Sequence, residues 1–132
     1  MLLNRYQDGN NLYYAGVRVD GSAVIKKKQN GTYYTLAFVP GIYPGAYDKS
    51  RNPNLLPSNK WIGIRCEIVN QSDGSVRIQL FIDKGWQGTW QLIAEAVDNG
   101  KAFGPAITHA GYGGIRTDFM DVMFENFRVR TF

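Results

Sequence analysis

The side chains in this sequence that are best suited to chemistry are aromatic rings and arginines that alternate with carboxylates along short runs. Sugars are bound by aromatic faces that stack on the ring and by planar polar groups that satisfy the hydroxyls. Eight residues on the solvent sides of the strands expected below supply both kinds of group: Tyr14, Arg18, Trp61, Arg65, Glu67, Arg77, Gln79 and Phe81. On neighbouring strands they would form one concave face for a glycan ligand, and the three arginines favour an acidic glycan. The plainer alternative is a set of cross-strand ion pairs and exposed aromatics that only cover a sheet.

Catalysis has less support in the sequence than binding. The three glutamates, Glu67, Glu95 and Glu125, fall on different expected strands, and none has another carboxylate two or four residues later. Glu67, Asp83 and Glu125 can still meet in space as a general acid and base. The sole histidine, His109, has no serine or cysteine motif nearby and is expected to be a loop imidazole. No catalytic residue is assigned, and the question of enzymatic activity stays open.

Antiparallel strands are expected to position these side chains. The stretch from Asn11 to Ala37 predicts three strands, because the dipeptides Asp20-Gly21 and Asn30-Gly31 are typical of tight hairpin turns. The runs 61–70 and 75–83 predict a second hairpin, because each alternates apolar and polar residues with period two.

Three further strands are expected at residues 90–97, 110–116 and 121–130, and no run predicts a helix. The fold class is therefore all-β: an antiparallel two-sheet jelly-roll sandwich of about eight strands. Trp86 and Trp90 bracket Gly88 in the turn before the first of these three strands. Trp90 is expected in the core, whereas Trp86 is either a sugar platform or an anchor on the body.

The size and charge of the chain bound its function. Its 132 residues suffice for one domain with a sizeable core. Part of the net charge of +4 comes from Lys26, Lys27 and Lys28, which either contact a polyanion or form a solvated strand end. We favour the solvated strand end and expect no nucleic-acid partner. The sole cysteine, Cys66, alternates with isoleucines and is expected to be a small buried hydrophobe.

Three runs that cover most of the chain match one known pattern of strands. They are LLNRYQDGNNLYYAGVRVDG, WIGIRCEI together with DGSVRIQLFID, and GGIRTDFMDVMFENFRVR. These runs resemble the middle strands, a hairpin and the last strand pair of the concanavalin A-like (laminin G-like) lectin/glucanase superfamily. The resemblance implies a jelly-roll fold. It does not choose a function, because the superfamily holds binding modules and glycosidases alike.

The resemblance also implies catalytic and metal motifs that this sequence does not carry. Glucanases of the superfamily have an E-x-D-x-x-E strand, which is absent, and lyase-type members have a Q-I-H strand, whereas Gln79 precedes Leu80 here. Relatives often bind a structural Ca²⁺ through an acidic residue of the last strand, which corresponds to Glu125 or Asn126. The usual aspartate is missing there, and the about six to eight oxygen ligands that calcium needs are not assembled. No metal and no cofactor is expected.

The tyrosine-rich strand of such domains follows several earlier strands, whereas here it begins close to Met1. The resemblance thus implies one domain over residues 1–132 that lacks the usual N-terminal strands. Such a domain leaves open sheet edges and exposed apolar faces. We therefore expect a second copy to cover them in a homo-oligomer.

The function expected from the sequence is non-catalytic, lectin-like carbohydrate binding. The alternatives are a glycoside hydrolase or polysaccharide lyase, and a protein-interaction or assembly domain that uses its sheet edges. The sequence shows no run of about 20 apolar residues that would span a membrane and no signal peptide, so no membrane partner is expected. As written, the chain is expected to be cytoplasmic, although members of the superfamily are often secreted.

Overall fold

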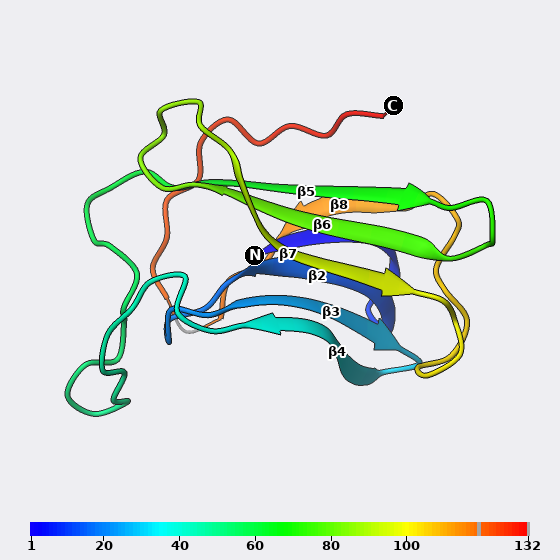
Figure 1. Ribbon diagram of the computed structural model, residues 1–132, viewed down its shortest axis with the longest axis horizontal. Coiled ribbons are helices and arrows are strands. Elements are labelled where there is room, and N and C mark those ends of the chain that lie inside the picture. Colours follow the sequence, from blue (N-terminus) through cyan, green and yellow to red (C-terminus); the bar gives the residue numbers. More distant parts are fainter. Residues whose placement is uncertain (119, 132) are drawn as a thin grey trace.

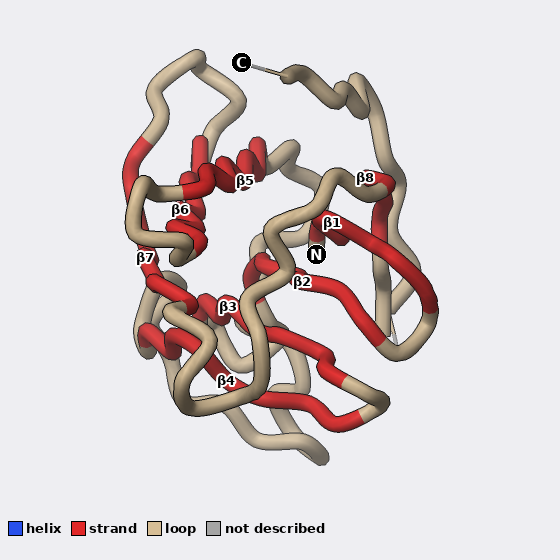
Figure 2. Tube along the Cα trace, turned by 90° about the vertical axis from the view of Figure 1, so that its right-hand side faces the viewer, coloured by secondary structure: helices blue, strands red, loops and turns tan. Residues whose placement is uncertain are grey.

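The computed structural model describes residues 1–118 and 120–131. Within them it contains no helix, and hence none able to cross a membrane. Eight strands form two antiparallel sheets, in the orders β4-β3-β2-β1-β8 and β5-β6-β7, which face each other in Figures 1 and 2. The strands are β1 (Leu2–Asp8), β2 (Asn11–Val17), β3 (Ala23–Gln29), β4 (Thr32–Val39), β5 (Gly63–Asn70), β6 (Val76–Asp83), β7 (Gln91–Asp98) and β8 (Tyr112–Ile115). The predicted fold class, an all-β antiparallel two-sheet sandwich of about eight strands, is confirmed.

The predicted turn dipeptides close the hairpins of the larger sheet. Asn30 and Gly31 both have positive φ, 49° and 83°, as a two-residue turn with the twist of the flanking strands requires. Between β2 and β3, the carboxylate of Asp20 accepts hydrogen bonds from the backbone N–H and the hydroxyl of Ser22, at 3.0 and 2.5 Å. Side chains of this type stabilise tight turns by bonding the backbone two residues on.

The strand predicted at Asp121–Arg130 is wrong, and β1 takes its place in the count. Residues 120–131, here called the C-terminal segment, run past the start of β5 without a ladder partner (red in Figure 1). At the edge of the larger sheet, the side chain of Val129 lies where a Cβ on Gly113 would be, 2.9 Å away, so β8 meets a side chain there. Alternation predicts an extended conformation, but a strand also needs a free edge to pair with.

The predicted faces of the second hairpin are confirmed. Val76, Ile78, Leu80 and Ile82 of β6 are fully buried, and the half-buried residues Ile64, Cys66 and Ile68 of β5 pack against the same core. Register places Cys66 opposite Leu80. Burial raises the pKa of the Cys66 thiol to about 12, so at neutral pH it behaves as a small hydrophobe.

A buried ion pair connects the two sheets. Nζ of Lys27, in β3, lies 2.8 Å from Oδ2 of Asp98, at the end of β7, and the two side chains are 0% and 3% exposed. The hydroxyl of Tyr13, in β2, donates to the same carboxylate oxygen at 2.6 Å. The expectation that all three lysines of the run are solvated is therefore wrong for Lys27. Alternation turns Lys27 to the core side of β3, opposite to Lys26 and Lys28.

The same polar groups also hold the loop that follows β7. Lys27 donates to the carbonyl oxygens of Gly104 and Pro105, at 2.9 and 2.7 Å, and the backbone N–H of Ile107 donates to the hydroxyl oxygen of Tyr13 at 2.9 Å. Burial and the adjacent Asp98 carboxylate raise the pKa of Tyr13, so its phenol stays protonated and donates. A buried charge is tolerated when it is paired and hydrogen-bonded in this way.

Replacing Lys27 by methionine is expected to destabilise the fold by about 3–5 kcal/mol, because Asp98 is left as an uncompensated buried charge. Urea unfolding followed by tryptophan fluorescence measures this loss. The double variant Lys27→Met/Asp98→Asn should regain part of the stability. Lys26→Met, a neighbour on the outer side of β3, is the matched control, with an expected change within about 0.5 kcal/mol. Equal losses for Lys27→Met and Lys26→Met would contradict the role of the pair.

Candidate tryptophan-lined binding site

Five of the eight residues predicted from the sequence share one surface, the outer face of β5 and β6. Register pairs Arg65 with Phe81 and Glu67 with Gln79, and Arg77 lies two residues further along the same face of β6. Trp61 precedes β5 at the end of the sheet nearest to Arg65, and its side chain is 46% exposed. Six of the predicted residues therefore belong to the smaller sheet and its end.

Tyr14 and Arg18 do not belong to this surface. Tyr14 lies in β2 of the larger sheet, on the side opposite to the core residue Tyr13, and Arg18 follows β2 and pairs with Asp20 at 3.2 Å. The expectation of one face with all eight residues is wrong. Alternation assigns a residue to the inside or outside of its own sheet, but the outer faces of the two sheets of a sandwich point in opposite directions.

Arg65 lies between two aromatic rings. Its guanidinium is 4.3 Å from the ring centre of Phe81 and 4.9 Å from that of Trp90, distances typical of cation–π contacts. Its Nε lies 3.2 Å from Oε1 of Glu67 as an ion pair. On the neighbouring strands Gln79 donates to Glu95 at 2.6 Å. Arginines and glutamates thus balance on this face, so it does not attract anions as the three arginines had suggested.

The turn after β6 is organised by a buried carboxylate. Asp83 accepts hydrogen bonds from the backbone N–H groups of Gly85, Gln87 and Gly88, at 3.3, 3.0 and 2.7 Å. Burial opposes ionisation of Asp83, but these donors outweigh it and lower its pKa. Within the turn, Trp86 has a φ of 53°, a left-handed conformation that is costly for a bulky residue. The turn therefore holds the Trp86 side chain, 52% exposed, in one place.

Trp86 and Trp90 both pack on the first residue of β5. A Cβ on Gly63 would lie 2.8 Å from the ring of Trp90 and 3.1 Å from that of Trp86, so a glycine is needed for this approach. Trp90 is half-buried beside Arg65 and is not part of the core cluster between the sheets. The expectation that Trp90 is a core residue is therefore wrong.

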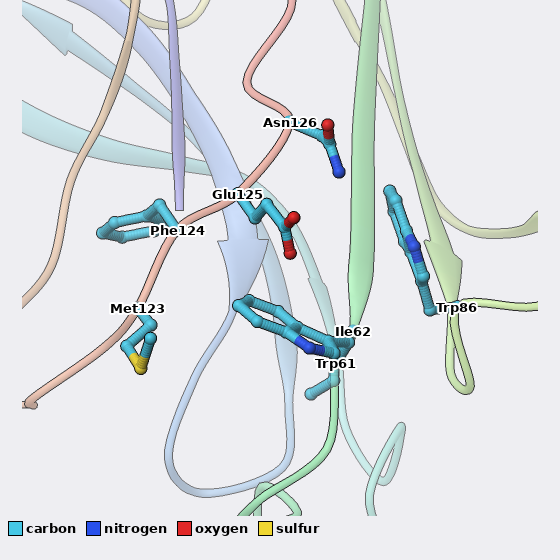
Figure 3. Close-up of a pocket in the computed structure, with 7 residues that line it drawn as sticks. All are labelled: Trp61, Ile62, Trp86, Met123, Phe124, Glu125 and Asn126. Atoms are coloured by element: carbon cyan, nitrogen blue, oxygen red, sulfur yellow. The ribbon is translucent and has the colours of Figure 1, made fainter.

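The C-terminal segment completes a hollow at this end of the sandwich. The carboxylate of Glu125 and the amide of Asn126 point toward the space between the Trp61 and Trp86 indoles (Figure 3). We call this the tryptophan hollow; its volume is about 80 Å³, and its walls are Trp61, Ile62, Trp86, Met123, Phe124, Glu125 and Asn126. Trp86 also borders a wider opening of about 290 Å³, which Asp83, Gly88 and Trp90 help to line.

The hollow combines two exposed indole faces with a carboxylate that accepts hydrogen bonds and an amide that both donates and accepts. Sequence analysis placed only Trp61 in a site and left Trp86 open. The turn in which Trp86 and Trp90 bracket a glycine was the available signal for Trp86. Glu125 and Asn126 were missed as ligand-binding residues because they were considered only as members of a last strand.

The three carboxylates considered for catalysis have different surroundings. Glu67 pairs with Arg65, Asp83 is enclosed by backbone N–H donors, and Glu125 borders the tryptophan hollow. Across residues 1–118 and 120–131, no three His, Cys, Asp or Glu side chains gather as metal ligands. Neither the protein-family models nor the curated proteins nor the solved structures yielded a match to this chain. The site is therefore interpreted from its own geometry.

The Asp83 turn gives a pH dependence with a defined sign. Because the folded protein lowers the pKa of Asp83, the ionised carboxylate stabilises the fold above its ordinary pKa of about 3.9, and this stability is lost as the pH falls through the lower folded pKa. Asp83→Asn should lower Tm at pH 7 and reduce the fall of Tm in acid. Thermal unfolding from pH 7 to pH 2 measures both, with Asp121→Asn as the charge-matched control. An unchanged acid slope in Asp83→Asn would refute this role.

Proposed function

We propose that this chain is a non-catalytic carbohydrate-binding module and that the tryptophan hollow is its binding site. The observation that carries the proposal is the pair of half-exposed indoles, Trp61 and Trp86, with the polar groups of Glu125 and Asn126 between them. The resemblance to the binding modules of the concanavalin A-like superfamily supports the same function at the level of the fold alone.

The chemistry of the hollow suits a sugar ring. Indole faces cover the apolar side of a pyranose, and the Glu125 carboxylate and Asn126 amide can bond its hydroxyls. The Asp83 turn fixes Trp86 before any ligand arrives, which reduces the ordering cost of binding. A negatively charged sugar would meet the Glu125 carboxylate, so we propose a neutral ring at this position.

The test is a glycan-array screen of the purified chain, followed by calorimetric titration of the glycans that bind. Trp61→Ala and Trp86→Ala should each weaken binding at least about tenfold, or ~1.4 kcal/mol, because each removes a stacking face. Leu92→Ala and Val97→Ala, which truncate exposed apolar residues of β7, are the matched controls and should leave affinity unchanged. Affinity that survives both tryptophan substitutions would refute the hollow as the site.

A glycosidase or lyase is distinguished by turnover of the same glycan. We propose that the bound glycan is recovered intact, because Glu67 and Asp83 are held by other groups of the fold. The assay follows release of reducing ends or unsaturated products over hours. Product formed by the unmodified chain and abolished in Glu125→Gln would overturn the non-catalytic proposal.

Self-assembly is a second candidate function, favoured by the exposed apolar side chains of the C-terminal segment. Val122, Met123, Phe124, Phe127 and Val129 are between 45% and 80% exposed, a patch that soluble monomers rarely leave open. We propose that a second copy covers them. Light scattering at micromolar concentration should give at least twice the mass of one chain, and Phe127→Ser/Val129→Ser should give one chain. A monodisperse monomer without substitution would contradict the proposal.

A further inference from the structure

A second group of cations and aromatic rings lies on the outer face of the larger sheet. The guanidinium of Arg116 is 4.9 Å from the ring centre of Tyr14 and 5.6 Å from that of Tyr33. Nζ of Lys28 is 4.8 Å from the Tyr33 ring centre, and the two tyrosines meet edge to face at 6.1 Å. These four residues are here called the Arg116 cluster.

Strand register and one chain crossing position the cluster. Lys28 in β3 pairs with Tyr33 in β4, and Tyr14 in β2 pairs with Lys26, so these side chains stand in adjacent rows on the side of the sheet away from the core. Arg116 directly follows β8, and its backbone N–H donates to the carbonyl oxygen of Met1 at 2.9 Å. The cluster is therefore built on a rigid sheet.

Positive charge exceeds negative charge at the cluster. Lys26, Lys28 and Arg116 face a single nearby carboxylate, Asp118, whose oxygens lie 3.0 Å from Nη2 and 3.3 Å from Nε of Arg116. An arginine has five N–H donors, so this pair leaves Nη1 of Arg116 available. Lys28 uses one of its three donors on the carbonyl oxygen of Gly9, at 2.6 Å.

The hydroxyl of Tyr33 is the meeting point of these cations. Arg116 and then Lys28 lower the pKa of Tyr33, because both favour negative charge on its oxygen. The Tyr33 side chain is 47% exposed, whereas Tyr14 is only 5% exposed and serves as a support beneath the guanidinium. A negatively charged group that approaches the Tyr33 edge would meet a planar fork, an ammonium and a hydroxyl donor.

We propose that the Arg116 cluster is a binding site for the carboxylate or sulfate groups of an acidic polysaccharide. Arginine binds such planar or tetrahedral oxyanions through paired N–H donors, and the exposed Tyr33 ring supplies a stacking surface for the attached sugar. The site goes beyond the tryptophan hollow, because it lies on the outer face of the other sheet and needs none of its residues. Single-stranded nucleic acids use several stacking rings along a groove, whereas one exposed ring serves here.

The experiment titrates the whole chain with a heparin-derived oligosaccharide and with an oligogalacturonate, at low and at moderate salt. We expect binding of at least one, weakened by salt, since screening acts on the ionic contacts. Lys28→Gln and Arg116→Gln should each reduce affinity at least fivefold with Tm kept near that of the unmodified chain. Lys49→Gln and Lys101→Gln make the same charge change at exposed sites elsewhere and should leave affinity nearly unchanged.

The remaining arms decide between the proposal and its rivals. Preference for heparin assigns sulfate groups, preference for oligogalacturonate assigns carboxylates, and either supports the site. Equal losses in the control and cluster variants would show diffuse attraction and overturn it, as would tighter binding of single-stranded DNA or no binding of either glycan. Trp86→Ala should leave this binding intact, so failure of the tryptophan hollow and failure of the Arg116 cluster are distinguishable.

Discussion

The arrangement of both sheets depends on the buried contact between Lys27 and Asp98. Removing two charges from water is costly, and the structure offsets this cost with the Tyr13 hydroxyl and two loop carbonyls. The pair also fixes register. A slip of β3 by one residue would turn Lys27 to solvent and move Lys26 or Lys28 into the core without a partner. The outward positions of Lys28 and Tyr33 therefore follow from the inward position of Lys27.

A single stretch of chain after β8 contributes to both candidate sites. Arg116 lies on the tyrosines of the larger sheet, and Glu125 and Asn126 lie between the indoles at the start of β5. The path between them crosses from the outside of one sheet to the end of the sandwich (Figure 2). Because this stretch makes no strand ladder within residues 120–131, its side chains remain available for contacts that a paired strand would restrict. Its open backbone is also where a second copy can add.

Local signals in the sequence predicted most of the fold. The Asn30-Gly31 turn and the alternation in β5 and β6 have short-range causes, namely positive φ and a one-sided core. Long-range facts were not predictable in this way. Three consecutive lysines do not reveal that one has a buried aspartate opposite it, 71 residues away in the chain. The strand expected at 121–130 has the right pattern but no neighbouring edge.

The site was predictable to the same degree. Arg65, Glu67 and Phe81 share a face because they lie on one hairpin. Tyr14 was misplaced because a sequence does not say which layer a strand joins. Trp86 owes its position to the Asp83 turn, and Glu125 to the path of an unpaired segment, and both depend on contacts far apart in the chain.

The most direct measurement is the two-dimensional ¹H–¹⁵N spectrum of the three tryptophan indole N–H groups during titration with a glycan identified on the array. Indole signals of Trp61 and Trp86 should shift in a saturable way with one common Kd, and the Trp90 signal should shift less because Trp90 is half-buried beside Arg65. Shifts confined to backbone signals of the larger sheet, with the Trp61 and Trp86 indoles unchanged at saturation, would contradict glycan binding at the tryptophan hollow.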